Sequence, residues 1–422
     1  MLYTTRTTCR LCGGDLKDVI SLGDIHLSTF LDTNDNAPPK IPLDLTQCVN
    51  CDLIQLRHTT DGSAMYSDYW YQSGLNGSMV RALNDVVEKV FKNIFLNAGD
   101  VVVDVGSNDG TLLGFYPSYV ETVGFEPSNL HLMSFNKAKV VFNDYFRKEP
   151  FEHYFHGQKA KVITAIAMFY DLEDPHSFVS DLKYILADDG IIVIQMMDLM
   201  SMVKYGDFPN ICHEHLEYYS LAVFRDLMQE HNLDVFDVEY NGVNGGSMRA
   251  YLCHKNSRRI QISVQQALDK EEGFFNAVGD LAIAFAKKIE DTRNKVVGFI
   301  HEANTLGQTV AVMGASTKGN TILQYFGLTE KDIIHAAEIN PDKFGKRTVG
   351  SNIPIISQQE SMRHFVDYYL ILPWGFIDNF IDRNKNYLMS GGLFIVPLPE
   401  PRIMGMNKEG EVIWTEAIKS YS

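Results

Sequence analysis

One stretch of the chain constrains the fold more than any other, because a β-branched apolar run breaks there into a glycine-spaced turn. It reads Val101-Val-Val-Asp104-Val-Gly106-Ser-Asn108-Asp-Gly110. A second apolar segment, Val123-Gly-Phe, ends at Glu126, 22 positions after Asp104. In a doubly wound sheet this spacing brings a carboxylate to the end of the neighbouring strand, where it can accept both hydroxyls of a bound ribose. The pattern therefore predicts a Rossmann-like, nucleoside-binding sheet.

The turn itself lacks the features of a phosphate-binding loop. Its glycines follow Gly106-x-x-x-Gly110 and not G-x-G-x-x-G, and the Gly-Lys-Ser/Thr ending of a P-loop is missing. The expected ligand has a ribose but no phosphate to cradle, which indicates S-adenosylmethionine. A turn cap is the alternative role for Asp104, and a solvated strand end is the alternative for Glu126. We expect cofactor contacts from Asp104, Gly106, Asn108, Gly110 and Glu126, and from Asn143 and Asp144 after the third strand unless that segment is a plain loop.

Length, composition and charge narrow the class of protein. The chain has 422 residues, which exceeds what one hydrophobic core usually serves, and 45% of them are hydrophobic. A formal net charge of −16 argues against nucleic acid as a partner, although a few local cations could still hold a small anionic substrate. No apolar run suits a membrane helix or a signal peptide. We expect a cytoplasmic enzyme of two or three domains, and the sequence indicates no protein partner.

Four of the six cysteines form two C-x-x-C pairs near the N-terminus. The pairs are Cys9 with Cys12 and Cys48 with Cys51, separated by 35 residues that we expect to form strands and a loop. Two such pairs suit a tetrahedral zinc site. Since all four ligands would be thiolates, no position stays open for a substrate and the metal is expected to be structural. Four unrelated thiols are the alternative, and a disulfide is less favoured without a secretory signal.

The rest of the chain alternates between helix-like and strand-like segments. This alternation predicts βαβ units with a parallel sheet, then a helical connector, then a second α/β unit. Strands are expected at 101–105, 121–125, 139–142, 162–167 and 190–196, then at 309–313, 334–339, 367–372 and 392–396, with helices at 83–95 and 264–304. We place a zinc-binding module at 1–70, a class I methyltransferase domain at 71–255, a helical connector at 256–305 and a C-terminal Rossmann-like α/β domain at 306–422.

A cluster of histidines follows the fifth expected strand. His213 and His215 flank Glu214 there, and loops at the carboxyl ends of parallel strands commonly carry the chemistry of such folds. An imidazole that takes a proton near neutral pH would sit beside a carboxylate that can orient it. A metal site is disfavoured because the two histidines lack i, i+4 spacing. A hydrogen-bonded structural cluster is the remaining alternative.

Taken in order, these motifs resemble the sugar C-methyltransferases that act on nucleotide-linked 4-keto-deoxysugars. The resemblance covers nearly the whole chain. It includes the four cysteines, Tyr69-Trp-Tyr71-Gln-Ser-Gly74, Asp104 with Glu126, His213-Glu214-His215, Asn244-Gly-Gly-Ser-Met-Arg249, Gly314-Ala-Ser-Thr-Lys318-Gly-Asn320, Asn340-Pro341 and Pro373-Trp374.

The resemblance implies transfer of a methyl group from S-adenosylmethionine to C3 of the sugar, next to its 4-ketone. The neighbouring carbonyl makes removal of the C3 proton possible because it accepts charge as an enolate. By resemblance His215 is the base, Glu214 and His213 support it, and Tyr71 contributes to the sugar pocket. The chain departs from the family at two positions, with Cys212 where the best-known members carry tyrosine and Asp171 near a position where they carry histidine.

The nucleotide-diphosphate sugar needs contacts of its own. Lys318 could bind the diphosphate at a helix N-terminus, unless this loop is a simple strand-to-helix turn. Arg249 is a second candidate anion anchor, and Asn244 and Asn320 are further substrate candidates. Trp374 is expected to pack and not to stack on a base.

Two other functions fit the same sequence features. An O- or N-methyltransferase on a related sugar would use the same histidine to deprotonate a hydroxyl or an amine. A non-catalytic protein that binds a sugar nucleotide or an adenosyl ligand would keep the fold without turnover. Both stay open from the sequence alone.

Overall fold

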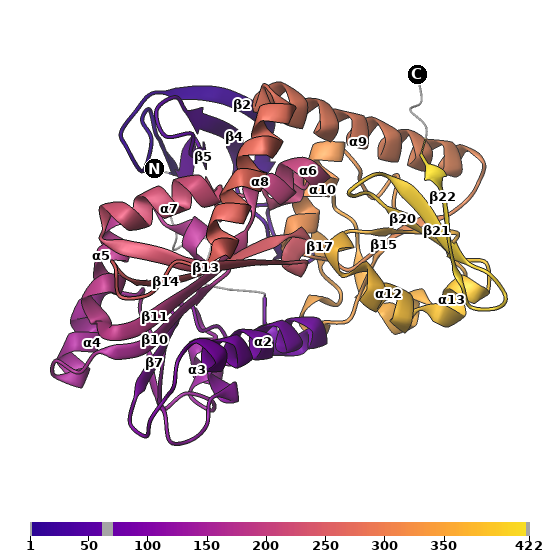
Figure 1. Cartoon of the computed structure of the whole chain (residues 1–422). Coiled ribbons are helices and arrows are strands. Elements are labelled where there is room, and N and C mark those ends of the chain that lie inside the picture. Colours follow the sequence, from indigo (N-terminus) through magenta and orange to yellow (C-terminus); the bar gives the residue numbers. More distant parts are fainter. Residues whose placement is uncertain (1, 61–70, 419–422) are drawn as a thin grey trace.

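The computed structural model describes residues 2–60 and 71–418, which form an N-terminal module, a central domain and a C-terminal domain, the last two joined by helices (Figure 1). Tyr69 and Trp70 of the aromatic motif lie outside the described residues, as does the expected module boundary at residue 70. In the described part of the chain, no helix is long and apolar enough to cross a membrane.

The N-terminal module is a small antiparallel sheet that borrows a strand from the next part of the chain. The order is β12-β5-β4-β2, and β12, Glu217–Tyr218, follows the histidine cluster directly. The gap between the cysteine pairs does form strands. The module's strands are β1 (Tyr3–Thr5), β2 (Leu16–His26), β3 (Phe30–Leu31), β4 (Lys40–Cys48), β5 (Ile54–Leu56) and β6 (His58–Thr60).

The central domain is built on a seven-stranded sheet of order β13-β14-β11-β10-β7-β8-β9. Its first five strands are parallel, whereas β14 runs antiparallel to both of its neighbours. The sequence analysis expects parallel strands only, and β14 differs because the short turn η5 (Val243–Gly245) reverses the chain. The strands are β7 (Val101–Val105), β8 (Glu121–Phe125), β9 (Val140–Phe142), β10 (Ala160–Ile166), β11 (Leu186–Met197), β13 (Leu233–Asn241) and β14 (Ser247–His254).

Helix α2, Gly77–Asn93, begins six residues before the expected start at Leu83. The reason is a cap, because the Asn76 side chain accepts a hydrogen bond from the Ser78 N–H. Its apolar face is buried against the sheet. The other helical segments here are η1 (Ser73–Leu75), η2 (Leu113–Phe115), α3 (His131–Ser134), α4 (Lys148–Phe155), η3 (Phe169–Asp171), α5 (Pro175–Ile185), α6 (Leu199–Tyr205), η4 (Phe208–Asn210) and α7 (Leu221–Glu230).

The expected helical connector is a pair of helices, α8 (Ile262–Val278) and α9 (Leu281–Thr305). Gly279 has a positive φ of 72° and ends α8, and the Asp280 side chain caps α9. Helix α9 contacts both β2 of the N-terminal module and β15 of the C-terminal domain (Figure 1). The connector therefore packs against the N-terminal module as well as against the C-terminal domain that follows it.

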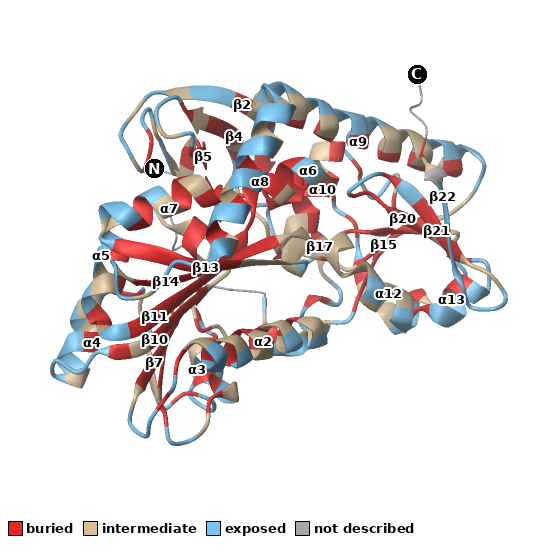
Figure 2. Cartoon of the chain, in the orientation of Figure 1, coloured by how far each residue is buried: buried red, intermediate tan, exposed pale blue. Residues whose placement is uncertain are grey.

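The C-terminal domain repeats the layered α/β design, as expected. Its sheet order is β18-β16-β15-β19-β20-β21-β22, with the last two strands antiparallel. Figure 2 shows most strands of both large sheets as buried, whereas residues 412–415 of the edge strand β22 and the outer faces of the helices are exposed. The elements are β15 (Val310–Met313), α10 (Thr317–Phe326), β16 (Ala336–Glu338), η6 (Pro341–Lys343), β17 (Arg347–Thr348), β18 (Ile355–Ser357), α11 (Gln358–Ser361), β19 (Tyr368–Ile371), η7 (Trp374–Phe376), α12 (Ile377–Arg383), α13 (Lys385–Met389), β20 (Leu393–Val396), β21 (Arg402–Met406) and β22 (Val412–Ala417).

A strand pair fastens the N-terminal module to the C-terminal domain. Strand β3 pairs antiparallel with β17, so Phe30 lies opposite Thr348 and Leu31 opposite Arg347. The Lys346 ammonium also lies 2.8 Å from a carboxylate oxygen of Asp32. The module thus contacts both larger domains.

Candidate active site

A cavity of about 290 Å³ lies at the carboxyl ends of the central strands β7, β8 and β10. It collects residues from the glycine-spaced turn, the histidine cluster and the start of α10 in the C-terminal domain. Among the site residues expected from the sequence, those that line it are Tyr71, Asp104, Gly106, Asn108, Glu126, Asp171, Glu214, His215, Asn244 and Lys318.

Two carboxyls end neighbouring strands in this cavity. Asp104, in β7, accepts a hydrogen bond from the Thr164 hydroxyl at 2.6 Å, and burial raises its pKa to about 7. The Glu126 carboxylate follows β8 and accepts the backbone N–H groups of Asn108 (2.7 Å) and Ser128 (2.9 Å). Each of its oxygens keeps a lone pair that a ribose hydroxyl can use.

The turn between these acids is shaped by residues with positive φ. Gly106 has φ 71°, and a Cβ there would lie 3.3 Å from the Met168 side chain. The Asn108 side chain accepts the Ser73 N–H at 3.0 Å and donates to the Tyr71 carbonyl at 3.0 Å, which holds that segment over the turn. Asn108 thereby fixes one wall of the cavity.

Three expected cofactor residues do not line the cavity. A Cβ on Gly110 would lie 2.8 Å from the Ser134 hydroxyl, so this glycine permits close packing of α3. The Asn143 amide donates to the carbonyl of Glu126 at 2.9 Å and supports that residue from behind. Asp144 is ion-paired with Arg147, while the next two residues, Tyr145 and Phe146, reach the cavity instead.

The His215 imidazole is buried and has its tautomer fixed. Its Nδ1 donates a hydrogen bond to the Asn210 carbonyl at 2.7 Å, which leaves the Nε2 lone pair free. Burial, and secondly the ammonium of Lys318, lower the pKa of His215 well below its usual value. The ring also lies edge-on to Tyr170, with centroids 4.4 Å apart. The group is therefore a neutral base at physiological pH.

Two carboxyls and one ammonium surround this imidazole. Burial raises the pKa of Glu214 to about 7, and burial together with Glu214 raises the pKa of Asp171 well above its usual value. One Asp171 oxygen, Oδ1, is buried without a hydrogen-bond partner in the described part of the chain. The Lys318 ammonium donates to the Asn210 side-chain oxygen at 2.5 Å. Burial thus favours the protonated form of Asp171, and its Oδ1 atom is open to a ligand.

His213 has a different position, since it lies outside this cavity and faces the N-terminal module. Its Nε2 donates to the Ile41 carbonyl at 3.1 Å, and burial lowers its pKa to about 4. The Leu56 N–H donates to the Leu216 carbonyl at 2.8 Å on the same side. The histidine loop is therefore fastened to the module's sheet. The neighbouring Cys212 is a buried thiol whose pKa burial raises.

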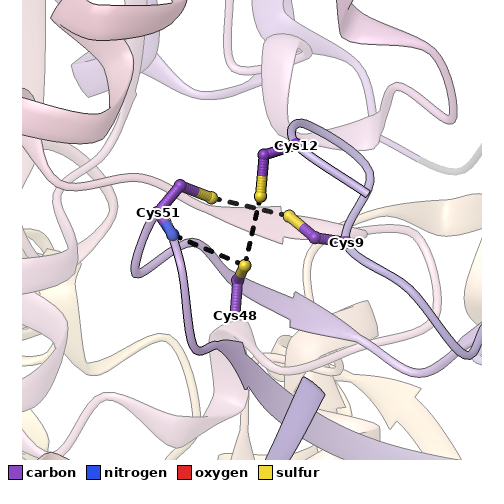
Figure 3. A group of neighbouring side chains, drawn as sticks. All are labelled: Cys9, Cys12, Cys48 and Cys51. Carbon is purple, nitrogen blue, oxygen red and sulfur yellow. Dashed lines mark hydrogen bonds between the residues drawn. The ribbon is translucent and has the colours of Figure 1, made fainter. Parts of the chain in front are cut away.

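The four N-terminal cysteines converge on one point (Figure 3). Their sulfurs all lie within 4.8 Å of one another, with Cys9 and Cys51 3.6 Å apart and Cys12 and Cys48 3.3 Å apart. A tetrahedral zinc ion with Zn–S bonds of roughly 2.3 Å requires sulfurs roughly 3.8 Å apart. Backbone N–H groups also point at the sulfurs of Cys9 and Cys48. The arrangement fits a structural zinc ion.

Two expected substrate residues have partners away from the cavity. Arg249 is fully buried and donates to Gln195, Glu239 and Asp85 at 2.7 to 2.8 Å. The Asn320 amide donates to the Ser28 hydroxyl and the Thr29 carbonyl, both at 3.1 Å, and so ties α10 to the N-terminal module.

The sequence analysis missed two residues that organise the site. Asn210 binds His215 through its carbonyl and Lys318 through its side chain. Thr164 donates to Asp104. Asn210 opens the motif that carries the histidines, so its place in that segment was the available signal. The sequence contains no signal for Thr164, because threonine is common inside strands.

The fold, the paired carboxyls and the zinc module define an S-adenosylmethionine-dependent methyltransferase. Three family models match the chain: "Putative zinc binding domain" at residues 9–66, "Methyltransferase domain" at 72–238 and "C-methyltransferase C-terminal domain" at 242–399. The chain is 32% identical to the C-methyltransferase NovU of Streptomyces niveus over 405 residues, 94% of this chain and 96% of that protein. It therefore belongs to the C-methyltransferase family, which confirms the resemblance.

Two similar solved structures each cover less than half of the chain. Magnesium protoporphyrin IX methyltransferase (ChlM) from Synechocystis PCC 6803, with bound SAH, has a TM-score of 0.34 and 13% identity over 45% of this chain and 90% of its own. The Haloferax volcanii complex between the Trm112 methyltransferase activator and its methyltransferase has a TM-score of 0.34 and 12% identity, over 43% of this chain and 95% of the matched one.

Proposed function

We propose that the chain methylates C3 of a nucleotide-linked 4-keto-6-deoxysugar in the cytoplasm. One observation carries the proposal: a single cavity holds the ribose-type carboxylate Glu126 and a buried, neutral imidazole, His215. S-adenosylmethionine, when bound, supplies an electrophilic methyl group. The protein must then make a carbon nucleophilic, which requires a base and an acceptor for the charge that develops.

The base is His215. Its Nε2 takes the C3 proton, and the electron pair of that C–H bond moves toward the 4-oxygen to give an enolate. The imidazolium so formed is stabilised by the Asn210 carbonyl at Nδ1 and by Glu214 beside it. A group with a lowered pKa stays ready to accept the proton over the whole neutral range.

The charge on the 4-oxygen is met by Asp171. Where family members carry histidine, this chain has a carboxyl whose pKa burial raises, and in its protonated form it would donate a hydrogen bond to the enolate oxygen. Its buried Oδ1 has no hydrogen-bond partner within the described residues, which leaves the group available to a ligand. Lys318 lies close enough to add positive charge. An aspartic acid can thus perform the donor function here.

The remaining parts shape and hold this site. Tyr71 and Asn244 line the cavity and are assigned to the sugar ring. We keep the division into a zinc module at 1–70, a methyltransferase domain at 71–255, a connector at 256–305 and a C-terminal domain at 306–422. In this scheme His213 is a positioning residue, because its contact with Ile41 sets the loop that carries His215.

The test is isotope exchange followed by product analysis. A panel of nucleotide 4-keto-6-deoxysugars is incubated with the enzyme in D₂O without methyl donor, and deuterium should enter C3. With the donor added, NMR should show one new methyl group on that carbon. A methyl group on oxygen or nitrogen, with no exchange at C3 for any sugar in the panel, overturns the proposal.

A further inference from the structure

Three side chains with metal-binding groups converge beside the catalytic cavity. The Cys212 sulfur, a Glu214 carboxylate oxygen and a ring nitrogen of His215 all lie within 4.8 Å of one another. The sulfurs of the N-terminal cysteines meet the same limit. Glu214 and His215 line the cavity, and Cys212 shares a second, smaller void with Glu214. The proposed mechanism gives the Cys212 thiol no role, so its place in this cluster needs another explanation.

The three groups are the kinds of ligand that zinc takes in proteins, namely a thiolate, a carboxylate and an imidazole. The thiolate favours zinc over magnesium or calcium, which prefer oxygen ligands alone. Three protein ligands leave one of the four tetrahedral positions open. The sequence analysis considered a metal only for His213 together with His215. The structure instead turns His213 toward the Ile41 carbonyl and brings Cys212 to His215.

The backbone of the loop holds these groups in place by itself. The His215 N–H donates to the Cys212 carbonyl at 3.1 Å, which closes a turn and brings the two side chains together. The loop is fastened on one side by the bond of His213 to Ile41, and just after it β12 pairs with β5. Ligands that are already positioned lose little conformational freedom when an ion binds.

One ammonium, that of Lys318, lies near the three groups and opposes a cation. Burial has the largest effect on the pKa of each group, and Lys318 lowers all three pKa values as well. The ammonium thereby favours thiolate, carboxylate and neutral imidazole, which are the forms that bind a metal. Burial favours the Cys212 thiol over its thiolate, but a metal ion displaces the proton of a thiol that it binds. Thiolate and carboxylate together then offset the charge of a divalent ion.

A fourth polar group and a small space adjoin the cluster. Burial first and Glu214 second raise the pKa of Asp171, which places this carboxyl near the proposed ligands. Its Oδ1 is buried and has no hydrogen-bond partner among the described residues, so a water on the open metal position has an acceptor there. The void that Cys212 and Glu214 share measures about 20 Å³, enough for a single water molecule.

We infer that Cys212, Glu214 and His215 form a second zinc site, and that zinc bound there inhibits the enzyme by taking the imidazole out of use as a base. An ion on Nε2 takes the lone pair directly. An ion on Nδ1 replaces the hydrogen bond to Asn210 and leaves the ring proton on Nε2, so the base is lost in either case. The thiol proton goes to solvent. The inhibition rests on the proposed function, whereas the binding of zinc does not.

The first test measures binding without turnover. Full-length protein that carries one equivalent of zinc is titrated with Co²⁺, and a thiolate-to-cobalt charge-transfer absorption should appear. Cys212→Ser should lack this absorption, and Glu214→Gln should weaken it. Cys253→Ser is the matched control, because Cys253 is the other buried cysteine outside the N-terminal pairs, and it should keep the absorption. Added zinc should displace the cobalt and remove the signal.

Kinetics then separate this inference from the proposed function. Zinc beyond one equivalent should slow methyl transfer, and Cys212→Ser should raise the half-inhibiting concentration about 100-fold, because it removes a direct ligand. Cys253→Ser should be inhibited like the wild type. If Cys212→Ser keeps the cobalt absorption, or is inhibited at the wild-type zinc concentration, the site does not exist, even where C-methylation is demonstrated. If the absorption depends on Cys212 but zinc does not inhibit, the site stands and His215 is not the base.

Discussion

The two large sheets of the molecule share the order of five strands, and the surroundings of one strand end differ between them. Five strands follow the same order in both, β9-β8-β7-β10-β11 in the central domain and β18-β16-β15-β19-β20 in the C-terminal domain. In each, the first strand leads into a glycine of positive φ, Gly106 at 71° and Gly314 at 86°. In each, the second strand leads to or ends in a glutamate, Glu126 or Glu338.

The surroundings of the two glutamates are what differ. Both accept two backbone N–H groups, Glu338 those of Ile339 and Asn340 at 2.7 and 3.0 Å. However, the Lys343 ammonium lies 3.7 Å from the other Glu338 oxygen and donates to the Ala315 carbonyl at 2.8 Å. A lysine of the protein thus takes the place that a ribose would take beside Glu126. On the proposed role of Glu126, the same framework would bind a nucleoside only where this place is left open.

In the proposed mechanism, proton transfer takes place in the central domain alone. Replacing the base His215 should therefore have the largest effect on the rate. We expect His215→Gln to lower kcat about 10³-fold, because loss of a positioned base costs 10² to 10⁴. Deuterium exchange at C3 should fall equally. His335→Gln, a half-buried histidine of the C-terminal half bonded to Ser361, should leave kcat unchanged. Equal losses of kcat in the two variants would contradict the assignment of proton transfer to the central domain.

Asp171 tests whether a protonated acid acts in the central half. Removal of a donor to an oxyanion costs about 10²-fold in kcat, so Asp171→Ala should lose about that much and Asp171→Asn much less. A raised pKa means that the proton is present at low pH and lost as pH rises. The wild-type rate should therefore fall on the alkaline side, and Asp171→Asn should lack that fall. A flat alkaline profile in the wild type would contradict this role.

The paired glutamates can be compared directly. Glu126→Gln should weaken S-adenosylmethionine binding about 30-fold, since one of two charged hydroxyl contacts is replaced by a neutral amide. Glu338→Gln should leave cofactor affinity unchanged, because Lys343 already fills that place. Equilibrium dialysis with labelled cofactor measures both. Cofactor binding that depends on Glu338 would show that the C-terminal half keeps a nucleoside site.

Removal of zinc should have the smallest effect of the four changes, and it should affect kcat before it affects cofactor binding. The module supports the loop of His215 through β12 and His213. Partial removal of zinc by a chelator should lower kcat about tenfold before cofactor affinity changes. Re-addition of zinc should restore the rate. A fall in cofactor affinity that precedes the loss of kcat would oppose this division of roles.

Local patterns predicted the elements well, and long-range register explains what they did not predict. The β-branched runs gave the strands from β7 to β11, and the C-x-x-C spacing gave the metal site. Arg249 was predicted as an anion anchor because it follows Asn244-Gly-Gly, yet it lies in β14 opposite Gln195 and Glu239. Which residues face one another across two strands cannot be derived from the sequence of one of them.

The pairing of β3 with β17 has a consequence for how the polypeptide is made. A ribosome releases Phe30 and Leu31 more than 300 residues before Arg347 and Thr348. Strand β3 must therefore stay unpaired until β17 has emerged. Pairing between strands so far apart in the sequence is slow, and it leaves the edge of β3 exposed until then. The pairing of β3 is therefore completed only after part of the C-terminal domain has been made.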